Sequence, residues 1–229
     1  MPPRNDDLHG NAPDNSRVAL VLVDVINDLE FEGADRLLPQ ALAMADRLAA
    51  LAARARRARV PVVYVNDNFG RWRSDFRTLL DRCLRGPVRG RSLARRLRPR
   101  ATDYVVLKTK HSGFYATTLE LLLRYLKAET LVLTGLTGDR CVLFTAADAF
   151  MRDFELFVPA DGTVSIEPEH NRHALAEMAR LLDADLTDST RLALSRSGVS
   201  TRGRAAAARP RSARGRPARP ARRSHAPAA

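Results

Sequence analysis

The sequence predicts an α/β fold in three layers, with a central, mostly parallel sheet of five to six strands between helices. Short apolar, β-branched runs recur along the chain, as is typical of strands that are covered on both faces. Segments with apolar residues at helical spacing separate these runs. Polar residues stand at the ends of the runs, and open parallel sheets place their active sites at those ends.

The first half of the chain alternates strand and helix. VALVLVD at 18–24 is the first expected strand, and it ends on Asp24. Residues 37–60 carry apolar side chains at helical spacing with arginines on the other side, and Pro61 ends this helix. PVVYV at 61–65 is the second strand, and short helices are expected at 76–84 and 92–97.

The second half continues the alternation. DYVVLK at 103–108 is the third strand and ends on Lys108, and TLVLT at 130–134 is the fourth. ELFVPAD at 155–161 is the fifth, and a weak sixth strand is expected at 184–186. Helices are expected at 117–127, 140–152 and 170–182. This order favours a parallel sheet with right-handed crossovers.

The charge of the chain is concentrated at its C-terminal end. The 229 residues carry a net charge of +12, but eleven arginines and no acidic residue follow Asp188, so the first 188 residues carry +1. We therefore expect three parts: a flexible leader at 1–16, one folded domain at 17–189, and a disordered Arg/Pro/Ala-rich tail at 190–229. Weak binding of a polyanion by this tail is a further expectation.

Two cysteines, Cys83 and Cys141, are too few for a disulfide framework, and the chain has no CxxC pair. The polar N-terminus lacks the apolar core of a signal peptide, and no later run approaches the length of a membrane span. These features predict a cytoplasmic protein without a membrane segment.

Three side chains at strand ends form a candidate catalytic group. Cys141 follows a buried strand and a glycine-containing loop at the start of a helix, where free N–H groups and the helix dipole favour a thiolate. Asp24 and Lys108 are placed to act as its base and its neighbouring cation. Each residue also has a simpler interpretation, since such an Asp often caps a helix, such a Lys is often solvated, and a free Cys often packs in a core.

Three segments carry a family resemblance: LVLVDVINDLEF, VLKTKHSGFYATTLELLL and LVLTGLTGDRCVLFTAADAFMRDFELFVPADG. Together they resemble the hallmark blocks of the isochorismatase-like, or nicotinamidase-related, cysteine hydrolases over about residues 18–186. The resemblance places the family's aspartate on Asp24, its nucleophile on Cys141, and its lysine on Lys108. Lys108 is preferred to Lys110 because the family lysine stands four residues before the serine of the S-[AG]-F element, here Ser112.

The resemblance also implies a mechanism of acyl transfer. Asp24 takes the thiol proton, Cys141 attacks an amide-type carbonyl, the amine leaves, and water hydrolyses the thioester. A cis peptide at Leu136–Thr137 is implied, with the N–H groups of Thr137 and Cys141 as the oxyanion hole. Relatives form dimers and larger oligomers, so we expect a homo-oligomer that acts on a small molecule.

Departures from the family narrow the chemistry. Metal-dependent nicotinamidases carry an Asp-x-His element after the second strand, whereas this chain has Asn66, Asp67 and Asn68 there, so we expect no metal and no cofactor. Isochorismatases proper cleave a vinyl ether and need not use a cysteine, so Cys141 favours cleavage of a carbon–nitrogen bond in an amide, ureido or carbamoyl compound.

Side chains near these strand ends are candidates for a small substrate pocket: Phe31, Asn68, Phe69, Trp72 and Phe114. For each aromatic member, packing in the core or against a partner subunit is at least as good an interpretation. His111 is not part of the family set, and we interpret its position beside the lysine as coincidence. Cys83 is interpreted as a helix residue, and His170 and His173 lack the partners that a metal site needs.

Three alternatives to an amidohydrolase stay open at this point. A vinyl-ether hydrolase would share the fold. A module that binds nucleic acid through the basic tail would owe its affinity to phosphate contacts, although the tail has no aromatic side chains to stack on bases. An inactive member of the same family would keep the three side chains behind a closed pocket.

Overall fold

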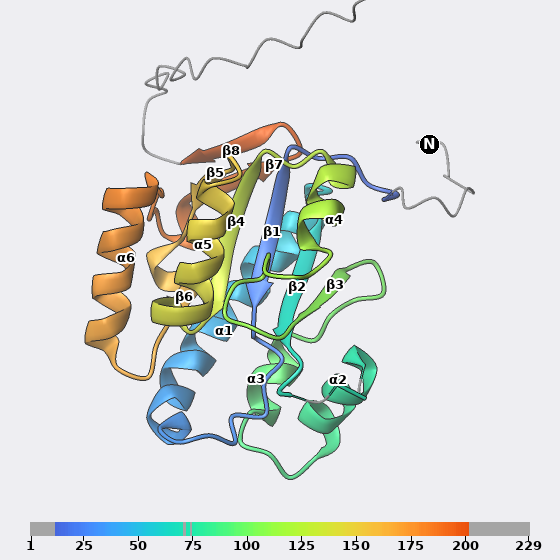
Figure 1. Cartoon of the computed structure of the whole chain (residues 1–229), viewed down its shortest axis with the longest axis vertical. Helices are drawn as coiled ribbons and strands as arrows, with labels where there is room; N and C mark the ends of the chain where they lie inside the picture. Colours follow the sequence, from blue (N-terminus) through green and yellow to red (C-terminus); the bar gives the residue numbers. More distant parts are fainter. Residues whose placement is uncertain (1–11, 71, 74, 202–229) are drawn as a thin grey trace, which may run out of the picture.

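The structure is a computed structural model that describes residues 12–70, 72–73 and 75–201 (Figure 1). Its main sheet has the strand order β3-β2-β1-β4-β5, with β6 also paired to β4, and every pair is parallel. The strands are β1 (Val18–Val23), β2 (Val62–Asp67), β3 (Tyr104–Lys108), β4 (Thr130–Leu136), β5 (Glu155–Phe157) and β6 (Thr163–Val164). The predicted three-layer α/β fold is confirmed.

Helices cover both faces of this sheet. The helices are α1 (Ala34–Arg57), α2 (Phe76–Arg85), α3 (Arg91–Arg96), α4 (Leu119–Leu126), α5 (Leu143–Phe150) and α6 (Pro168–Leu182), with short turns η1 (Gly138–Val142), η2 (Ala160–Gly162) and η3 (Ser189–Arg191). Buried residues of α1, α2 and α3 share one apolar cluster, and those of α4, α5 and α6 share the other. Figure 1 shows α4, α5 and α6 in front of the sheet and α1 behind it.

Strand β1 shows why a continuous apolar run marks a central strand. All six of its residues have no exposed surface. Leu20 and Leu22 belong to the cluster behind the sheet, whereas Ala19 and Val21 belong to the cluster in front. Alternate side chains of a strand point to opposite faces, so both sets are apolar only when both faces are covered.

The last strands are shorter than predicted. We expected one strand over 155–161, but β5 ends at Phe157, and Pro159, which has no N–H to donate, begins a turn that leads into β6. The weak strand expected at 184–186 is a single parallel bridge between Asp185 and Phe157. The helix expected at 140–152 begins earlier, as the π-helical turn η1, and continues as α5.

The prediction of disorder from residue 190 is wrong for its first twelve residues. β7 (Leu192–Ser195) and β8 (Gly198–Thr201) form an antiparallel hairpin, and Leu192 is 2% exposed within the α1 cluster. The N–H of Arg17 donates to the carbonyl of Arg196 at 2.7 Å, which ties the hairpin to the start of β1. This short segment contains apolar residues, but they contribute little to the average composition of the arginine-rich C-terminal stretch as a whole.

The N-terminal leader also differs from the prediction at its end. Ser16, expected in a flexible segment, is 2% exposed, and its hydroxyl donates to the carbonyl of Val18 at 2.7 Å. Residues 1–11 and 202–229 lie outside the described part, and with them most of the arginine-rich tail and its predicted binding of a polyanion.

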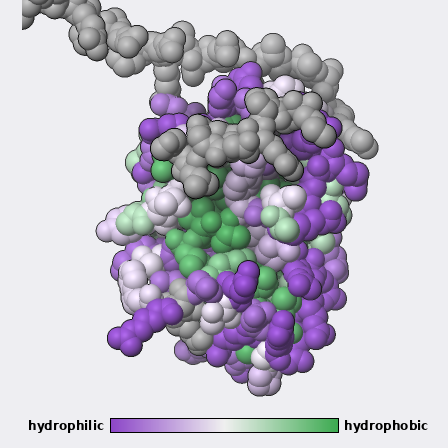
Figure 2. All heavy atoms as spheres, turned by 90° about the vertical axis from the view of Figure 1, so that its right-hand side faces the viewer, coloured by the Kyte–Doolittle hydropathy of each residue, from purple (hydrophilic) through white to green (hydrophobic). Residues whose placement is uncertain are grey.

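One side of the molecule has an exposed apolar patch. Figure 2 shows it on the side that carries β3 and α4, surrounded by hydrophilic residues. These two elements hold Val105, which is 37% exposed, and Leu121, which is 49% exposed. The homo-oligomer stays a prediction, and this side is a candidate for its contact surface. Within the described residues, no helix has both the length and the apolar character needed to cross a bilayer.

Candidate active site

Three residues that are far apart in sequence meet at the carboxyl edge of the sheet. Asp24 directly follows β1, Lys108 is the last residue of β3, and Cys141 lies in η1 directly after β4. The Nζ of Lys108 is 2.8 Å from Oδ2 of Asp24 and 3.4 Å from Sγ of Cys141. The structure therefore brings together the three side chains that the sequence singled out, as parallel strand order requires.

Lys108 is a fully buried cation with four partners. Besides Asp24 and Cys141, its Nζ donates to the carbonyl of Lys110 at 3.1 Å and lies 3.6 Å from Oδ2 of Asp67. Burial acts to lower the pKa of Lys108, but the negative charge of Asp24 and its hydrogen bond to the ammonium, with the charge of Asp67, act in the opposite direction, and the pKa is raised. The lysine is therefore positively charged while it contacts the thiol.

Asp24 is held at the start of its loop by backbone contacts. Its φ is +53°, in the left-handed region that Asp tolerates better than most residues. Its N–H donates to the carbonyl of Val65 at 2.9 Å, and its Oδ1 accepts the N–H of Asp67 at 2.6 Å. Burial raises the pKa of this carboxyl group and Lys108 opposes the rise, which makes Asp24 a stronger base than an exposed aspartate.

Cys141 is partly exposed and lies beside both charged groups. Its pKa is raised to about 12, first by burial and then by the negative charge of Asp24, which together outweigh Lys108. This corrects our expectation that the start of the helix would favour a thiolate. The thiol is protonated at neutral pH, so a reaction at Cys141 needs a base, and the pKa of Asp24 is shifted toward that task.

Gly135 sets the path of the loop before Cys141. Its φ is +120°, and a Cβ at this position would lie 2.1 Å from the carbonyl oxygen of Val23, so β1 and β4 can approach only with glycine here. The cis peptide that we expected at Leu136–Thr137 is absent: every described peptide bond is trans, the form favoured by about 3 kcal/mol. Gly135 lies within β4, which continues to Leu136 before η1 begins at Gly138. The oxyanion hole at Thr137 and Cys141 stays a prediction.

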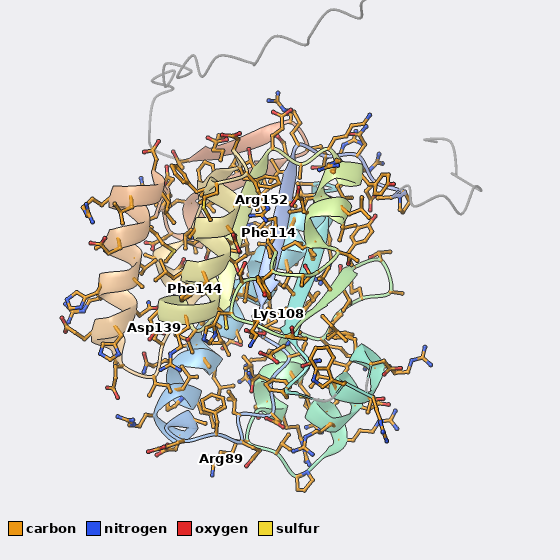
Figure 3. All side chains as sticks on the ribbon, in the orientation of Figure 1. Arg89, Lys108, Phe114, Asp139, Phe144 and Arg152 are labelled. Atoms are coloured by element: carbon orange, nitrogen blue, oxygen red, sulfur yellow. The ribbon has the colours of Figure 1, made fainter. Side chains whose placement is uncertain are left out.

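The predicted pocket residues do not all lie at the site. Asn68 and Phe69 follow β2 beside it, and the N–H of Asn68 donates to the carbonyl of Lys108 at 3.0 Å. Phe31 and Trp72 are 37% and 78% exposed. Phe114 is 4% exposed and packs against another aromatic ring beneath the guanidinium of Arg152, so it is a core residue. Figure 3 shows Phe114 close to Arg152 and apart from Lys108.

Two residues at the site were missed by sequence reasoning. Asp67 is the register partner of Lys108 in the β2–β3 pair, and a correct alignment of these strands would have found it. His111, interpreted above as coincidence, places Nδ1 at 3.6 Å from Sγ of Cys141. Its position depends on the loop after β3, which follows no regular pattern. Across the described residues, no group of three or more His, Cys, Asp or Glu side chains is arranged to hold a metal ion.

A carboxylate, a buried lysine and a thiol at the carboxyl edge of a parallel sheet define the class of α/β cysteine hydrolases. Residues 18–190 match the family model described as the isochorismatase domain. An isochorismatase family protein of Bacillus subtilis, YaaI, is 35% identical over 169 residues, which cover 74% of this chain and 92% of the relative. The chain therefore belongs to the isochorismatase family, and the prediction of an enzyme of this family is confirmed.

Two further similar proteins are named for activities of the amidohydrolase type. The crystal structure of N-carbamoylsarcosine amidase from Thermoplasma acidophilum aligns with a TM-score of 0.58 and 31% identity, over 76% of this chain and 96% of that protein. The ureidoacrylate amidohydrolase RutB of Methylobacterium radiotolerans is 41% identical over 83 residues, which cover 36% of this chain and 32% of the relative.

Proposed function

We propose that this chain hydrolyses a carbon–nitrogen bond of a small ureido, carbamoyl or amide compound through a thioester on Cys141. One observation carries the proposal: the buried ammonium of Lys108 lies between the carboxylate of Asp24, at 2.8 Å, and the sulfur of Cys141, at 3.4 Å. This arrangement joins a nucleophile, a base and a fixed positive charge in one contact network.

The first half of the reaction forms the thioester. Asp24 takes the proton from the thiol as Sγ attacks the carbonyl carbon, and Lys108 stabilises the negative charge that develops on sulfur. When the tetrahedral intermediate collapses, the carbon–nitrogen bond breaks and Asp24 returns the proton to the leaving nitrogen. The N–H groups of Thr137 and Cys141 are the proposed donors to the oxyanion.

The second half releases the acid. Water attacks the thioester carbon, the carbon–sulfur bond breaks, and the thiolate leaves beside the ammonium of Lys108, 3.4 Å away in the free enzyme. A proton from the attacking water restores the thiol, so no group of the protein is consumed.

The relatives favour cleavage at a ureido or carbamoyl group. An amidase named for N-carbamoylsarcosine aligns over almost its whole length, and a second relative is named for ureidoacrylate. Both names describe a C–N bond next to a carbonyl, which a thiol nucleophile can attack. The bond that a vinyl-ether hydrolase cleaves has no such carbonyl. A loss of activity in a variant without the Cys141 thiol therefore distinguishes the two reactions.

The test is a screen of N-carbamoyl amino acids, ureido acids and simple amides for release of ammonia. We expect Cys141→Ala to abolish release, while Cys83→Ala, which removes the buried thiol of α2, retains it. Intact mass spectrometry after rapid quenching should detect an acyl adduct on the wild type alone. Ammonia release that persists in Cys141→Ala would refute the proposed mechanism.

A further inference from the structure

The loop that follows β3 places an exposed histidine, His111, in contact with the nucleophile. His111 is exposed, whereas Lys108 has no exposed surface and Asp24 is 5% exposed. Nδ1 of His111 lies 3.6 Å from Sγ of Cys141, within the contact range of a hydrogen bond to sulfur. The thiol therefore has two acid–base partners, of which Asp24 is buried and His111 is exposed to solvent.

The backbone on both sides of His111 is anchored. Before it, the carbonyl of Lys110 accepts a hydrogen bond from Nζ of Lys108 at 3.1 Å. After it, the hydroxyl of Ser112 donates to the carboxylate of Asp148, and the N–H of Gly113 donates to Oγ1 of Thr145 at 2.9 Å. These contacts fix the position of the backbone from which the imidazole projects.

The imidazole ring is also positioned from the side of the nucleophile. It packs against the ring of Phe144 with the centroids 5.5 Å apart and the planes tilted by 37°. Phe144 belongs to α5, the helix that continues from the turn carrying Cys141 and that also carries Thr145 and Asp148. One helix thus orients both the sulfur and the imidazole. Figure 3 shows the labelled Phe144 on α5, with Lys108 at the end of β3 nearby.

The two acid–base groups are suited to different halves of the reaction. In the resting enzyme both oxygens of the buried Asp24 are engaged, one by the N–H of Asp67 at 2.6 Å and the other by Lys108 at 2.8 Å. The water that cleaves the thioester arrives from solvent, on the side where the imidazole stands. A base is most effective within hydrogen-bonding reach of the proton that it removes.

We propose that His111 is a catalytic residue that activates the water in the second half of the reaction, an inference that rests on the proposed function. With the proton on Nε2, Nδ1 of His111 accepts a proton from water as the water oxygen bonds to the thioester carbon. The carbon–sulfur bond then breaks, the acid is released, and the imidazolium returns this proton to the thiolate of Cys141. The charge and the number of protons on the enzyme are the same before and after the cycle.

The test separates the two halves of the reaction with p-nitrophenyl acetate. Its leaving group departs without an added proton, so release of nitrophenolate reports on acylation of Cys141, and the steady state reports on deacylation. In His111→Ala we expect acylation within about threefold of the wild type and a steady-state rate about 100-fold lower, the usual contribution of a general base. A stoichiometric burst of nitrophenolate and an acetyl-enzyme seen by intact mass should therefore appear.

Two controls distinguish catalysis from support of the loop. Added imidazole should restore much of the steady-state rate of His111→Ala, because the position is open to solvent, and His170→Ala, which removes an exposed histidine of α6, should behave as the wild type. An unchanged steady-state rate in His111→Ala overturns the inference, as does an equal loss in both phases that imidazole does not restore. If Cys141→Ala releases nitrophenolate as fast as the wild type, the proposed function itself fails.

Discussion

Asp24→Asn should have opposite effects on the reactivity of Cys141 and on turnover. In the wild type, Oδ1 of Asp24 accepts the N–H of Asp67 at 2.6 Å. Asparagine has the same size and keeps an oxygen that can accept this bond, but it removes the negative charge beside the thiol. That charge is the second cause, after burial, of a thiol pKa raised to about 12. Without it, the ammonium of Lys108 at 3.4 Å is the dominant charge next to the sulfur, so the pKa of Cys141 should fall.

The size of the effect can be estimated from Coulomb's law for two neighbouring charges. Two unit charges about 4 Å apart at an effective dielectric constant of about 20 interact by about 4 kcal/mol, which corresponds to about three pKa units. At pH 8 the thiolate fraction would then rise by up to about 1000-fold. A less basic thiolate is also less nucleophilic, with a Brønsted slope of about 0.4–0.5, so we expect alkylation to accelerate by about 10-fold or more.

The assay is the rate of alkylation of Cys141 by iodoacetamide from pH 7 to 10, read from the mass of its peptide. In the wild type the rate should rise with pH over this whole range without a plateau, because the pKa of about 12 lies above it. In Asp24→Asn the rate at pH 8 should be higher, while turnover of the substrate found by ammonia release falls at least 100-fold. Asp28→Asn, which removes a buried carboxylate paired with Arg82 instead, is the matched control. Alkylation that is slower or unchanged in Asp24→Asn would refute the electrostatic reasoning.

Three further substitutions test the site and the fold. Cys141→Ala should abolish turnover and leave the midpoint of thermal unfolding within a few degrees of the wild type, since this side chain is only partly buried; a large drop in the midpoint would indicate a structural role. Leu192→Ala should lower the free energy of unfolding by about 2–4 kcal/mol in a urea titration. Leu192 is 2% exposed and packs in the same apolar cluster as α1, so an unchanged free energy would show that the hairpin is not packed there. Gly135→Ala should prevent accumulation of folded protein, or lower the free energy of unfolding by more than about 3 kcal/mol in the same titration. The reason is that the new Cβ would lie 2.1 Å from the carbonyl oxygen of Val23. A stability near that of the wild type would contradict this close approach.

The positions of Asp24, Lys108 and Cys141 could be predicted because strand ends are visible in the sequence. Each lies at or just past the end of an apolar run, and the carboxyl ends of parallel strands share one edge. The contact of His111 with the thiol could not be predicted, because it depends on hydrogen bonds between the loop after β3 and α5. Such bonds join residues more than thirty positions apart and leave no periodic signal.

The other errors have three separate causes, of which the first is composition averaged over a long window. The stretch from 190 onward is so rich in Arg, Ala and Pro that its average hides Leu192, which is enough to anchor a hairpin on α1. Phe114 was one of the pocket candidates because it lies near a strand end in the sequence. Its ring turns into the core instead, since the N–H of Gly113 is bonded to α5 and directs the next residue inward. The raised pKa of Cys141 could not be foreseen either, because it depends on burial and on a carboxylate from another strand.

The cation of the site stands on the outermost strand of the sheet. Among the described strands, β3 pairs with β2 alone, so a single ladder of hydrogen bonds joins the backbone of Lys108 to the sheet. Asp24 and Cys141 instead follow β1 and β4, which have neighbours on both sides. Peripheral strands separate from a sheet at a lower energetic cost than interior ones. Partial opening at this margin would withdraw the ammonium from the sulfur and the carboxylate together, so mild denaturant should inactivate the enzyme before the core unfolds.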